Sequence, residues 1–484
     1  MTGYRSLSSV LLALAIAIPC PLAAQAKATA ATRLTPEQRV DSLMAAYDRT
    51  DSPGGVVAVV RGGEVIFAKG YGMAQLEYGI PNTPQTIYHV ASISKQFTAF
   101  AIALLESRGL LSLDDEIHKY LPELPDFGAP ITIRQLIHHT SGLRDQWALW
   151  VVAGGTLADV IRQEELLQLV QRQRELNFAP GTANLYCNTG YTLLSEIVER
   201  VSGESFREFM RKNVFEPLGM KDSQIYEDHG RIVPGRAYSY IGSPDRGVRK
   251  MILSYGNQGA TSLFTTVLDL ARWVNNFRTG QVGGPGVIAR MQERGVLASG
   301  DTIIYAFGLV IDEFRGLRRI AHSGSDAGFR TMVAYYPELD AGVITFSNVA
   351  SFPGSMAERI AEVFFGEHMT PRPPAPAHQH HPVPQELLER YTGIYRVAGG
   401  PAYTFRVEDG RLTASVEGDG DISYRAVSDS VFAVVAQLGR TVFHREPDGR
   451  VLRATITTRN GTFEARRIEP WSPDAAELAT FAGT

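Results

Sequence analysis

The sequence has little of what marks the special classes of protein. It contains only two cysteines in 484 residues, and its 47 basic and 51 acidic residues leave a formal net charge of -4. Beyond the N-terminus, no stretch approaches the ~20 consecutive apolar residues that cross a bilayer. The near balance of charge argues against nucleic acid or an anionic membrane as partner, while 44% hydrophobic residues suffice for sizeable cores. At ~150 residues per domain, a globular chain of this length holds about three structural units.

The N-terminus has the three-part layout of a cleavable signal peptide over residues 1–26. A single charge, Arg5, precedes an apolar run at residues 10–18, and Ala-Gln-Ala at residues 24–26 supplies small residues for cleavage. Because the run is well short of the ~20 residues of a membrane anchor, we expect a secreted or periplasmic protein without stable membrane insertion. Cleavage leaves one cysteine, Cys187, which excludes an intramolecular disulfide.

Residues 34–366 show strand patterns at both ends and helical patterns in the middle. Strands are predicted at 56–60 and 65–69, joined by Gly62-Gly63, and at 303–310, 318–323, 330–336 and 343–346. Residues 92–280 have helical periodicity, and an amphipathic helix is predicted at 356–365. The fold class is therefore α+β, with an antiparallel sheet assembled from distant segments, helices packed on it and a helical insertion.

The C-terminal part reads as a linker, a small all-β module and a tail. Residues 367–384 are rich in proline and predict a stiff linker; its His378, His380 and His381 favour a solvated tether over a metal site. Residues 385–470 alternate as strands do and carry the hairpin signals Asp409-Gly410, Asp448-Gly449 and Asn460-Gly461. Such a module is expected to close into a barrel, followed by a tail at 471–484.

The first candidate for chemistry is Ser92-Ile93-Ser94-Lys95 at the start of a predicted helix. A spacing of three places the Ser92 hydroxyl and the Lys95 amine on one helix face, where the amine can take the proton of a serine nucleophile. Ser-x-x-Lys is a common pattern, but the chain has only seven lysines and Lys95 alone has such a partner.

The second candidate is Tyr186-Cys187-Asn188. A phenol beside a cation can act as general base, and a neighbouring carboxamide can position both the lysine and a substrate carbonyl. Tyr255-Gly256-Asn257 is an alternative with the same pattern, but its glycines favour a turn. Cys187 is expected to pack inward as a small apolar residue.

The third candidate is His322-Ser323-Gly324-Ser325 at the end of a predicted strand. Gly324 lets a substrate backbone approach the strand edge. The amide nitrogen of Ser325 could join that of Ser92 as the two donors for a developing oxyanion.

Together these motifs resemble those of the penicillin-recognising serine hydrolases, nearest to the class C β-lactamase and DD-peptidase branch. The stretches 133–143, 178–181 and 265–270 resemble the same family, and the resemblance covers about residues 34–366. It implies a β-lactamase/transpeptidase-like fold. The C-terminal module is similar to the lipocalin-like barrel of some members, including D-aminopeptidase-like enzymes, and such a barrel could act as a lid over the catalytic cleft.

The resemblance also assigns roles to the matching residues. Ser92 would be acylated, Lys95 and Tyr186 would share the proton transfers, and Asn188 would orient the acyl amide. His322, Ser323, Gly324 and Ser325 would bind substrate. No cofactor or metal is implied, and His138 and His139, which lack a partner at ligand spacing, are expected to cap and pack.

His322 stands where the commoner family pattern has lysine. An unperturbed histidine has a pKa of ~6.5 and is mostly neutral at pH 7, so it binds a substrate carboxylate more weakly than a charged lysine does. We therefore expect an exported serine hydrolase that forms an acyl-enzyme from the amide, peptide or ester bond of a small-molecule or peptide substrate. Peptidase or esterase activity, on a peptide with a D-residue or a small ester, is favoured over efficient penicillin hydrolysis. The alternative is a penicillin- or ligand-binding sensor that is acylated without turnover. The absence of Gly-x-Ser-x-Gly excludes the α/β-hydrolase nucleophile elbow. Oligomeric state is left open by the sequence.

Overall fold

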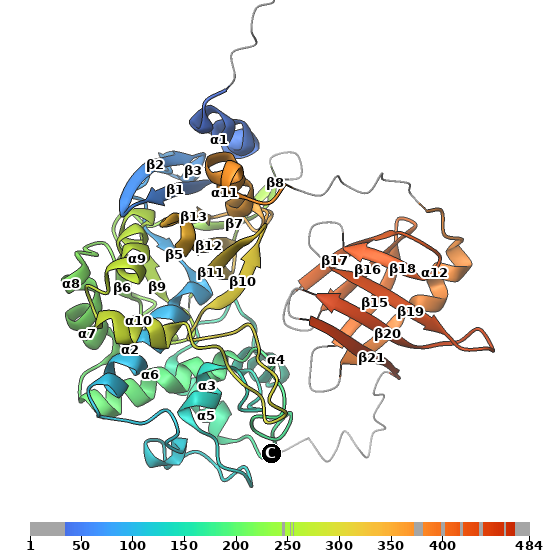
Figure 1. Cartoon of the computed structure of the whole chain (residues 1–484), viewed down its shortest axis with the longest axis horizontal. Coiled ribbons are helices and arrows are strands. Elements are labelled where there is room, and N and C mark those ends of the chain that lie inside the picture. The colour runs from blue at the N-terminus through green and yellow to red at the C-terminus, as the bar shows by residue number, and fades with distance from the viewer. Residues whose placement is uncertain are drawn as a thin grey trace, which may run out of the picture.

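The computed structural model in Figure 1 describes residues 34–243, 247–251, 253–254, 256–371, 381–397, 402–416, 420–434, 439–458 and 461–469. The predicted signal peptide, half of the linker including His378 and His380, Tyr255 and the tail lie outside these ranges. Within them, no helix combines the length and apolar character that crossing a bilayer requires.

A six-stranded antiparallel sheet forms the centre of the larger body, with strand order β10-β11-β12-β13-β1-β2. Its strands are β1 (Gly55–Arg61), β2 (Glu64–Tyr71), β10 (Val310–Phe314), β11 (Leu317–Asp326), β12 (Phe329–Tyr336) and β13 (Ala341–Ser347). Along β1, Val56, Ala58 and Val60 belong to one apolar core, and Val57 and Val59 belong to a second. The sheet is therefore covered on both faces, which is why β1 is apolar at consecutive positions.

Helices from the two ends of this body pack on one face of the sheet. These are α1 (Pro36–Met44) and α11 (Met356–Phe365), drawn together at the top of Figure 1. The other face carries α9 (Val267–Thr279), and beyond it α2 (Ser94–Ser107) packs against α6 (Asn188–Ser202) and α10 (Gly284–Met291).

The remaining helices lie in the insertion: α3 (Ile133–Ile137), α4 (Gln146–Val152), α5 (Gln163–Gln171), α7 (Phe206–Met210) and α8 (Glu216–Leu218). Short strands pair beside them: β3 (Met73–Gln75) with β4 (Ile80–Pro81), β5 (Tyr88–His89) and β6 (Gln224–Ile225) with β9 (Leu263–Thr265), and β7 (Ser239–Ser243) with β8 (Gly247–Met251).

The α+β prediction is confirmed, and several local predictions agree with the structure. The Gly62-Gly63 hairpin joins β1 to β2, and α11 has the predicted bounds. The strand predicted at 303–310 is wrong, because regular pairing begins only at Val310. Gly308 has a φ of +67°, and a Cβ there would lie 2.5 Å from the backbone of Lys95, so the chain turns against α2 where the pattern suggested a strand.

The C-terminal module is a closed antiparallel barrel. Its strands are β14 (Gly393–Val397), β15 (Ala402–Glu408), β16 (Arg411–Val416), β17 (Gly420–Ala426), β18 (Val431–Val434), β19 (Arg440–Arg445), β20 (Val451–Thr458) and β21 (Gly461–Ile468), preceded by α12 (Gln385–Tyr391). Tyr391, Tyr395, Phe405 and Phe443 are buried in one aromatic cluster, with Tyr391 stacked on Phe443 at 4.4 Å. Aromatic side chains from the strands and α12 thus pack the barrel core.

A buried ion pair ties the edge of the main sheet to α11. Arg319 on β11 is 3% exposed and donates to both carboxylate oxygens of Asp312 on β10, at 2.8 and 2.6 Å. It also donates to Glu358 on α11 at 2.6 Å. Removing the guanidinium would leave two carboxylates with little solvent around them.

Replacing Arg319 by methionine is expected to lower the free energy of unfolding by about 3–5 kcal/mol, since both carboxylates would lose their cation. Arg318→Ala is the matched control, because the neighbouring side chain is exposed, and should change stability by less than ~0.5 kcal/mol. Urea denaturation of both variants measures the difference, and equal stabilities would contradict the assigned role.

Candidate active site

Ser92 lies on a short 3₁₀-helix, η2 (Ala91–Ile93), between β5 and α2. Ala91 before it has a φ of +50°, a left-handed conformation that is uncommon outside glycine. Gly324 of β11 passes directly over this turn, since a Cβ there would lie 2.3 Å from the Val90 carbonyl oxygen. Thr331 of β12 donates to the same carbonyl at 2.9 Å. The sheet and the start of α2 are thus in contact at the nucleophile candidate.

The Lys95 amine is fully buried next to Ser92. Its Nζ donates to Ser92 Oγ at 3.1 Å, to Asn188 Oδ1 at 2.8 Å and to the Ala260 carbonyl at 2.7 Å. Burial lowers the pKa of Lys95 to about 7, and the negative charges of Asp145 and Asp326 oppose that shift. A large fraction of the amine is therefore neutral at physiological pH.

Tyr186 covers this amine from the solvent side. Its ring centroid is 4.9 Å from Lys95 Nζ, and 41% of the residue is exposed. Burial around the hydroxyl raises the pKa of Tyr186 above its ordinary value, although a hydrogen bond with Ser92 opposes the shift. Although part of Tyr186 is exposed, its pKa is still raised, because the hydroxyl itself faces Ser92. The phenol is therefore protonated at neutral pH.

Asn188 is the first residue of α6, and its amide group is held at both ends. Its Oδ1 accepts from Lys95, while its Nδ2 and backbone N–H both donate to Asp145 Oδ2, at 2.8 and 2.6 Å. Asp145 is the N-cap of α4, where its Oδ1 accepts from the Trp147 amide. One hydrogen of Nδ2 stays uncommitted to Asp145 and can meet a substrate carbonyl.

His322 lies on the inward face of β11, 5% exposed, with both ring nitrogens in hydrogen bonds. Nδ1 lies 2.6 Å from the Ser323 carbonyl, and Nε2 lies 3.0 Å from the Tyr305 hydroxyl. The carbonyl requires Nδ1 to carry the hydrogen, so Nε2 accepts from Tyr305. Burial and the Lys95 charge lower the pKa of His322 to about 4, so this position supplies no cation near pH 7.

The end of β11 offers a strand edge to a ligand. Pairing of β10 with β11 runs only from Leu317 to Ala321, whereas β12 pairs as far as Asp326. Among the described strands, residues 322–326 therefore have a neighbour on one side only. The side chains of Ser323 and Ser325 are exposed on the face opposite to His322, so they could contact substrate at this edge through backbone groups.

The structure thus brings Ser92, Lys95, Tyr186, Asn188 and the His322–Ser325 strand end together. Of the alternative motif, Asn257 is fully buried and hydrogen-bonds Gln146 at 2.9 Å and Gln163 at 2.6 Å, which is a structural role. Sequence reasoning missed the Ala260 carbonyl, which has no side-chain signal. It also missed Asp145, whose place before a helix indicates an N-cap and nothing about Asn188.

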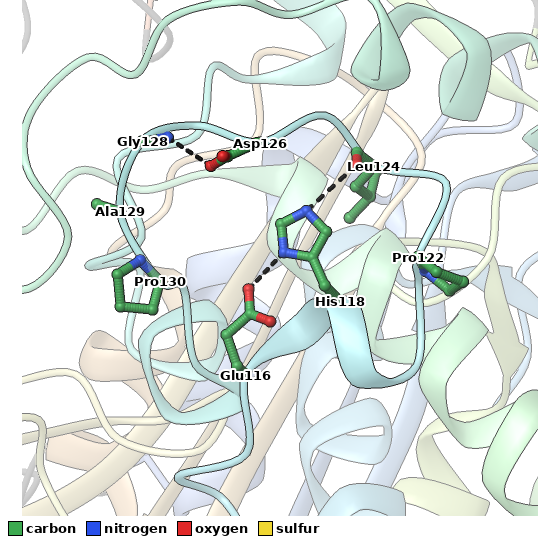
Figure 2. Close-up of a pocket in the computed structure, with 8 residues that line it drawn as sticks. All are labelled: Glu116, His118, Pro122, Leu124, Asp126, Gly128, Ala129 and Pro130. Atoms are coloured by element: carbon green, nitrogen blue, oxygen red, sulfur yellow. Dashed lines mark hydrogen bonds and ion pairs between the residues drawn. The ribbon is translucent and has the colours of Figure 1, made fainter.

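A separate surface hollow of about 680 Å³ lies along the loop at residues 116–130 (Figure 2). There His118 contacts the Glu116 carboxylate and lies 3.2 Å from the Leu124 carbonyl. None of its lining residues belongs to the Ser92 centre. No group of three histidine, cysteine or acidic residues in the described ranges is arranged to hold a metal ion.

The chain belongs to the beta-lactamase family, whose family model matches residues 37–366. It is 28% identical to a penicillin-binding protein of Bacillus subtilis over 383 residues, covering 75% of this chain and 84% of that protein. It is 30% identical to a D-aminopeptidase of Cereibacter sphaeroides over 374 residues, covering 76% of this chain and 70% of that protein.

The fold is similar to that of an octameric penicillin-binding protein homologue from Pyrococcus abyssi. The superposition has a TM-score of 0.64 at 25% identity and covers 88% of this chain and 99% of that chain. The resemblance to penicillin-recognising proteins is therefore confirmed at the level of family and fold, and the chain is of the serine hydrolase class.

Replacing Gly324 by alanine is expected to separate β11 from the Ser92 turn, because the new Cβ would lie 2.3 Å from Val90 O and 3.1 Å from Ala91 Cβ. Such overpacking costs about 1–3 kcal/mol of stability. Gly354 is the control, because it is exposed and a Cβ added there would have no atom within 4 Å, so Gly354→Ala should be neutral. Denaturation curves test this, and equal stability of the two variants would show that β11 tolerates the displacement.

Proposed function

We propose that this chain is an exported serine hydrolase that cleaves amide, peptide or ester substrates through an acyl-enzyme on Ser92. The observation that carries the proposal is the buried Lys95 amine, 3.1 Å from Ser92 Oγ, with a pKa lowered to about 7. A serine hydroxyl is a weak nucleophile until a neighbouring base takes its proton, and a partly neutral amine at this distance is such a base.

The reaction begins when neutral Lys95 accepts the Ser92 proton and Oγ attacks the substrate carbonyl carbon. The carbonyl electrons move to oxygen, and the amides of Ser92 and Ser325 are proposed to donate to that oxyanion. Its collapse expels the leaving group, which takes a proton from the Tyr186 hydroxyl, and the phenol is reprotonated from Lys95. Water then attacks the acyl-enzyme with Lys95 again as base, the bond from Ser92 Oγ to the acyl carbon breaks, and Lys95 returns the proton to Oγ. The raised pKa of Tyr186 supports this division, in which the phenol relays protons and the amine starts the reaction.

Because His322 is neutral, the end of β11 offers no cation, and this supports a substrate that needs none there. We propose a peptide with a D-residue or a small ester rather than a penicillin, since the pKa of His322 is lowered to about 4. The D-aminopeptidase name of one relative supports the same class. The signal-peptide pattern at residues 1–26 supports export, and we propose a substrate in the periplasm or outside the cell.

Covalent labelling tests the nucleophile. A fluorophosphonate should label the purified protein, and Ser92→Ala should abolish the label, whereas Ser107→Ala at the other end of α2 should keep it. Hydrolysis of p-nitrophenyl esters, D-amino-acid amides and a chromogenic cephalosporin should be lost with the label. A labelled Ser92→Ala variant would refute the assignment, and a fluorescent-penicillin label retained for hours with no turnover of any substrate would identify a sensor.

The pH dependence tests the base. Because Lys95 must be neutral to accept a proton and its pKa is about 7, the labelling rate should rise as pH increases through about 7 and then level off. Stopped-flow labelling from pH 5 to 9 measures this limb. A rate that is still rising at pH 9 would instead assign the base to the phenol. Tyr186→Phe should keep the limb near 7 while slowing turnover by roughly 10²- to 10⁴-fold.

A further inference from the structure

The segment from His139 to Asp145 lies along the whole Tyr186–Asn188 motif. His139 accepts two backbone N–H groups from this region. Leu185 N–H, just before the motif, donates to its carbonyl at 3.0 Å, and Cys187 N–H, within the motif, donates to its ring Nδ1 at 3.1 Å. These two donors flank Tyr186 in sequence. The residue that carries the phenol is therefore held on both sides by a single histidine.

The ring of His139 also packs against the Tyr186 ring, with an angle of 43° between the two planes. Its centroid is 4.3 Å from the Tyr186 ring, and the rings of Tyr305 and Tyr191 lie at 4.5 and 5.1 Å. His139 is 2% exposed and adopts a φ of +57°, a conformation that bulky residues rarely take. The surrounding structure holds it there, as is common for residues that orient a functional site.

The hydrogen bond from Cys187 fixes the chemical form of this ring. Nδ1 accepts, so the single ring hydrogen lies on Nε2. Burial, together with the nearby charge of Lys95, lowers the pKa of His139 well below its ordinary value. The ring is therefore neutral at neutral pH and keeps its acceptor there.

Asp145 performs the corresponding function at the other end of the segment. Its Oδ2 accepts from both the backbone and the side-chain nitrogen of Asn188, which turns the Asn188 oxygen toward Lys95. Between the two ends, the Leu143 carbonyl accepts from Cys187 Sγ at 3.3 Å, and the Arg144 carbonyl accepts from Thr189 Oγ1 at 2.7 Å. The segment thus forms a hydrogen bond with every residue from 185 to 189 except Tyr186, which instead packs on the His139 ring.

We propose that His139 and Asp145 are positioning residues, His139 for the Tyr186 phenol and Asp145 for the Asn188 amide. The inference rests on the proposed function, because it concerns the same reaction. It goes beyond the expectation of capping and packing, since it assigns each side chain a specific catalytic-site group to orient. Neither residue needs to touch the substrate.

Two substitutions at residue 139 isolate the acceptor. Asparagine and glycine both tolerate a φ near +57° and both remove the ring, but only asparagine keeps an acceptor for Cys187 N–H. His139→Gly should slow fluorophosphonate labelling by roughly 10²-fold, since small displacements of reacting groups cost that much. His139→Asn should recover about tenfold of that loss.

His138→Asn is the matched control. His138 is also buried, but its Nε2 lies 3.2 Å from the Glu293 carbonyl and not on the Tyr186 motif, so the labelling rate should stay near that of the parent protein. Equal rates for His139→Gly, His139→Asn and the parent would overturn the assignment to His139. A control as slow as His139→Gly would also overturn it, because general packing would then explain the loss.

Two substitutions at residue 145 separate charge from geometry. Asp145→Asn keeps an oxygen acceptor and the N-cap but removes the charge that raises the pKa of Lys95, so the acid limb of the labelling profile should move to lower pH with a small loss of rate. Asp145→Ala removes the acceptor as well and should slow labelling by roughly 10²-fold. An unshifted limb in Asp145→Asn, or an unimpaired Asp145→Ala, would overturn this part.

Melting curves and Ser92→Ala complete the design. If His139→Gly does not fold, the comparison of His139→Asn with His138→Asn and the limb of Asp145→Asn still decide the question. If Ser92→Ala is labelled, the proposed function fails. If Ser92→Ala is not labelled while the variants at residues 139 and 145 are labelled as fast as the parent protein, only the positioning role fails.

Discussion

The structure of the site depends on the burial of one amine. A lysine side chain removed from water needs acceptors for its hydrogens, and the three around Lys95 come from Ser92, from Asn188 at the start of α6, and from the Ala260 backbone. Each acceptor belongs to a different part of the chain. The three hydrogen bonds of the amine therefore form only when these parts of the chain come together, which also assembles the site. The same burial lowers the pKa of Lys95 to about 7.

The sheet and the helical insertion contribute different halves of this centre. The sheet brings the end of β11 to the Ser92 turn, through the close approach of Gly324 to Val90. The insertion brings Asn188 and Tyr186, which are held by the segment before α4. The two halves meet at Lys95, so a displacement of either one alters the reacting groups.

His322, at the position where the commoner family pattern has lysine, leaves this strand end without a cation. The imidazole is enclosed by Tyr305 and the Ser323 carbonyl, and burial keeps it neutral. Near Ser92, the negative charges of Asp145 and Asp326 partly balance the positive charge of protonated Lys95. Such a balance supports the proposed substrates, which need no carboxylate at this strand end.

The sequence alone determined what depends on local chemistry: the Gly62-Gly63 hairpin, the helix at 356–365, the strand-rich C-terminal module with its Asp-Gly turns, and the three motifs proposed to carry the chemistry. Periodicity failed at 303–310, because the turn at Gly308 is imposed by contact with Lys95. Only the tertiary structure decided that Asp145 and His139 flank the second motif, that a backbone carbonyl completes the lysine site, and that His322 is buried and neutral. These properties arise from contacts between residues distant in sequence, and solvent exclusion, which sets the pKa values, exists only once the chain has folded.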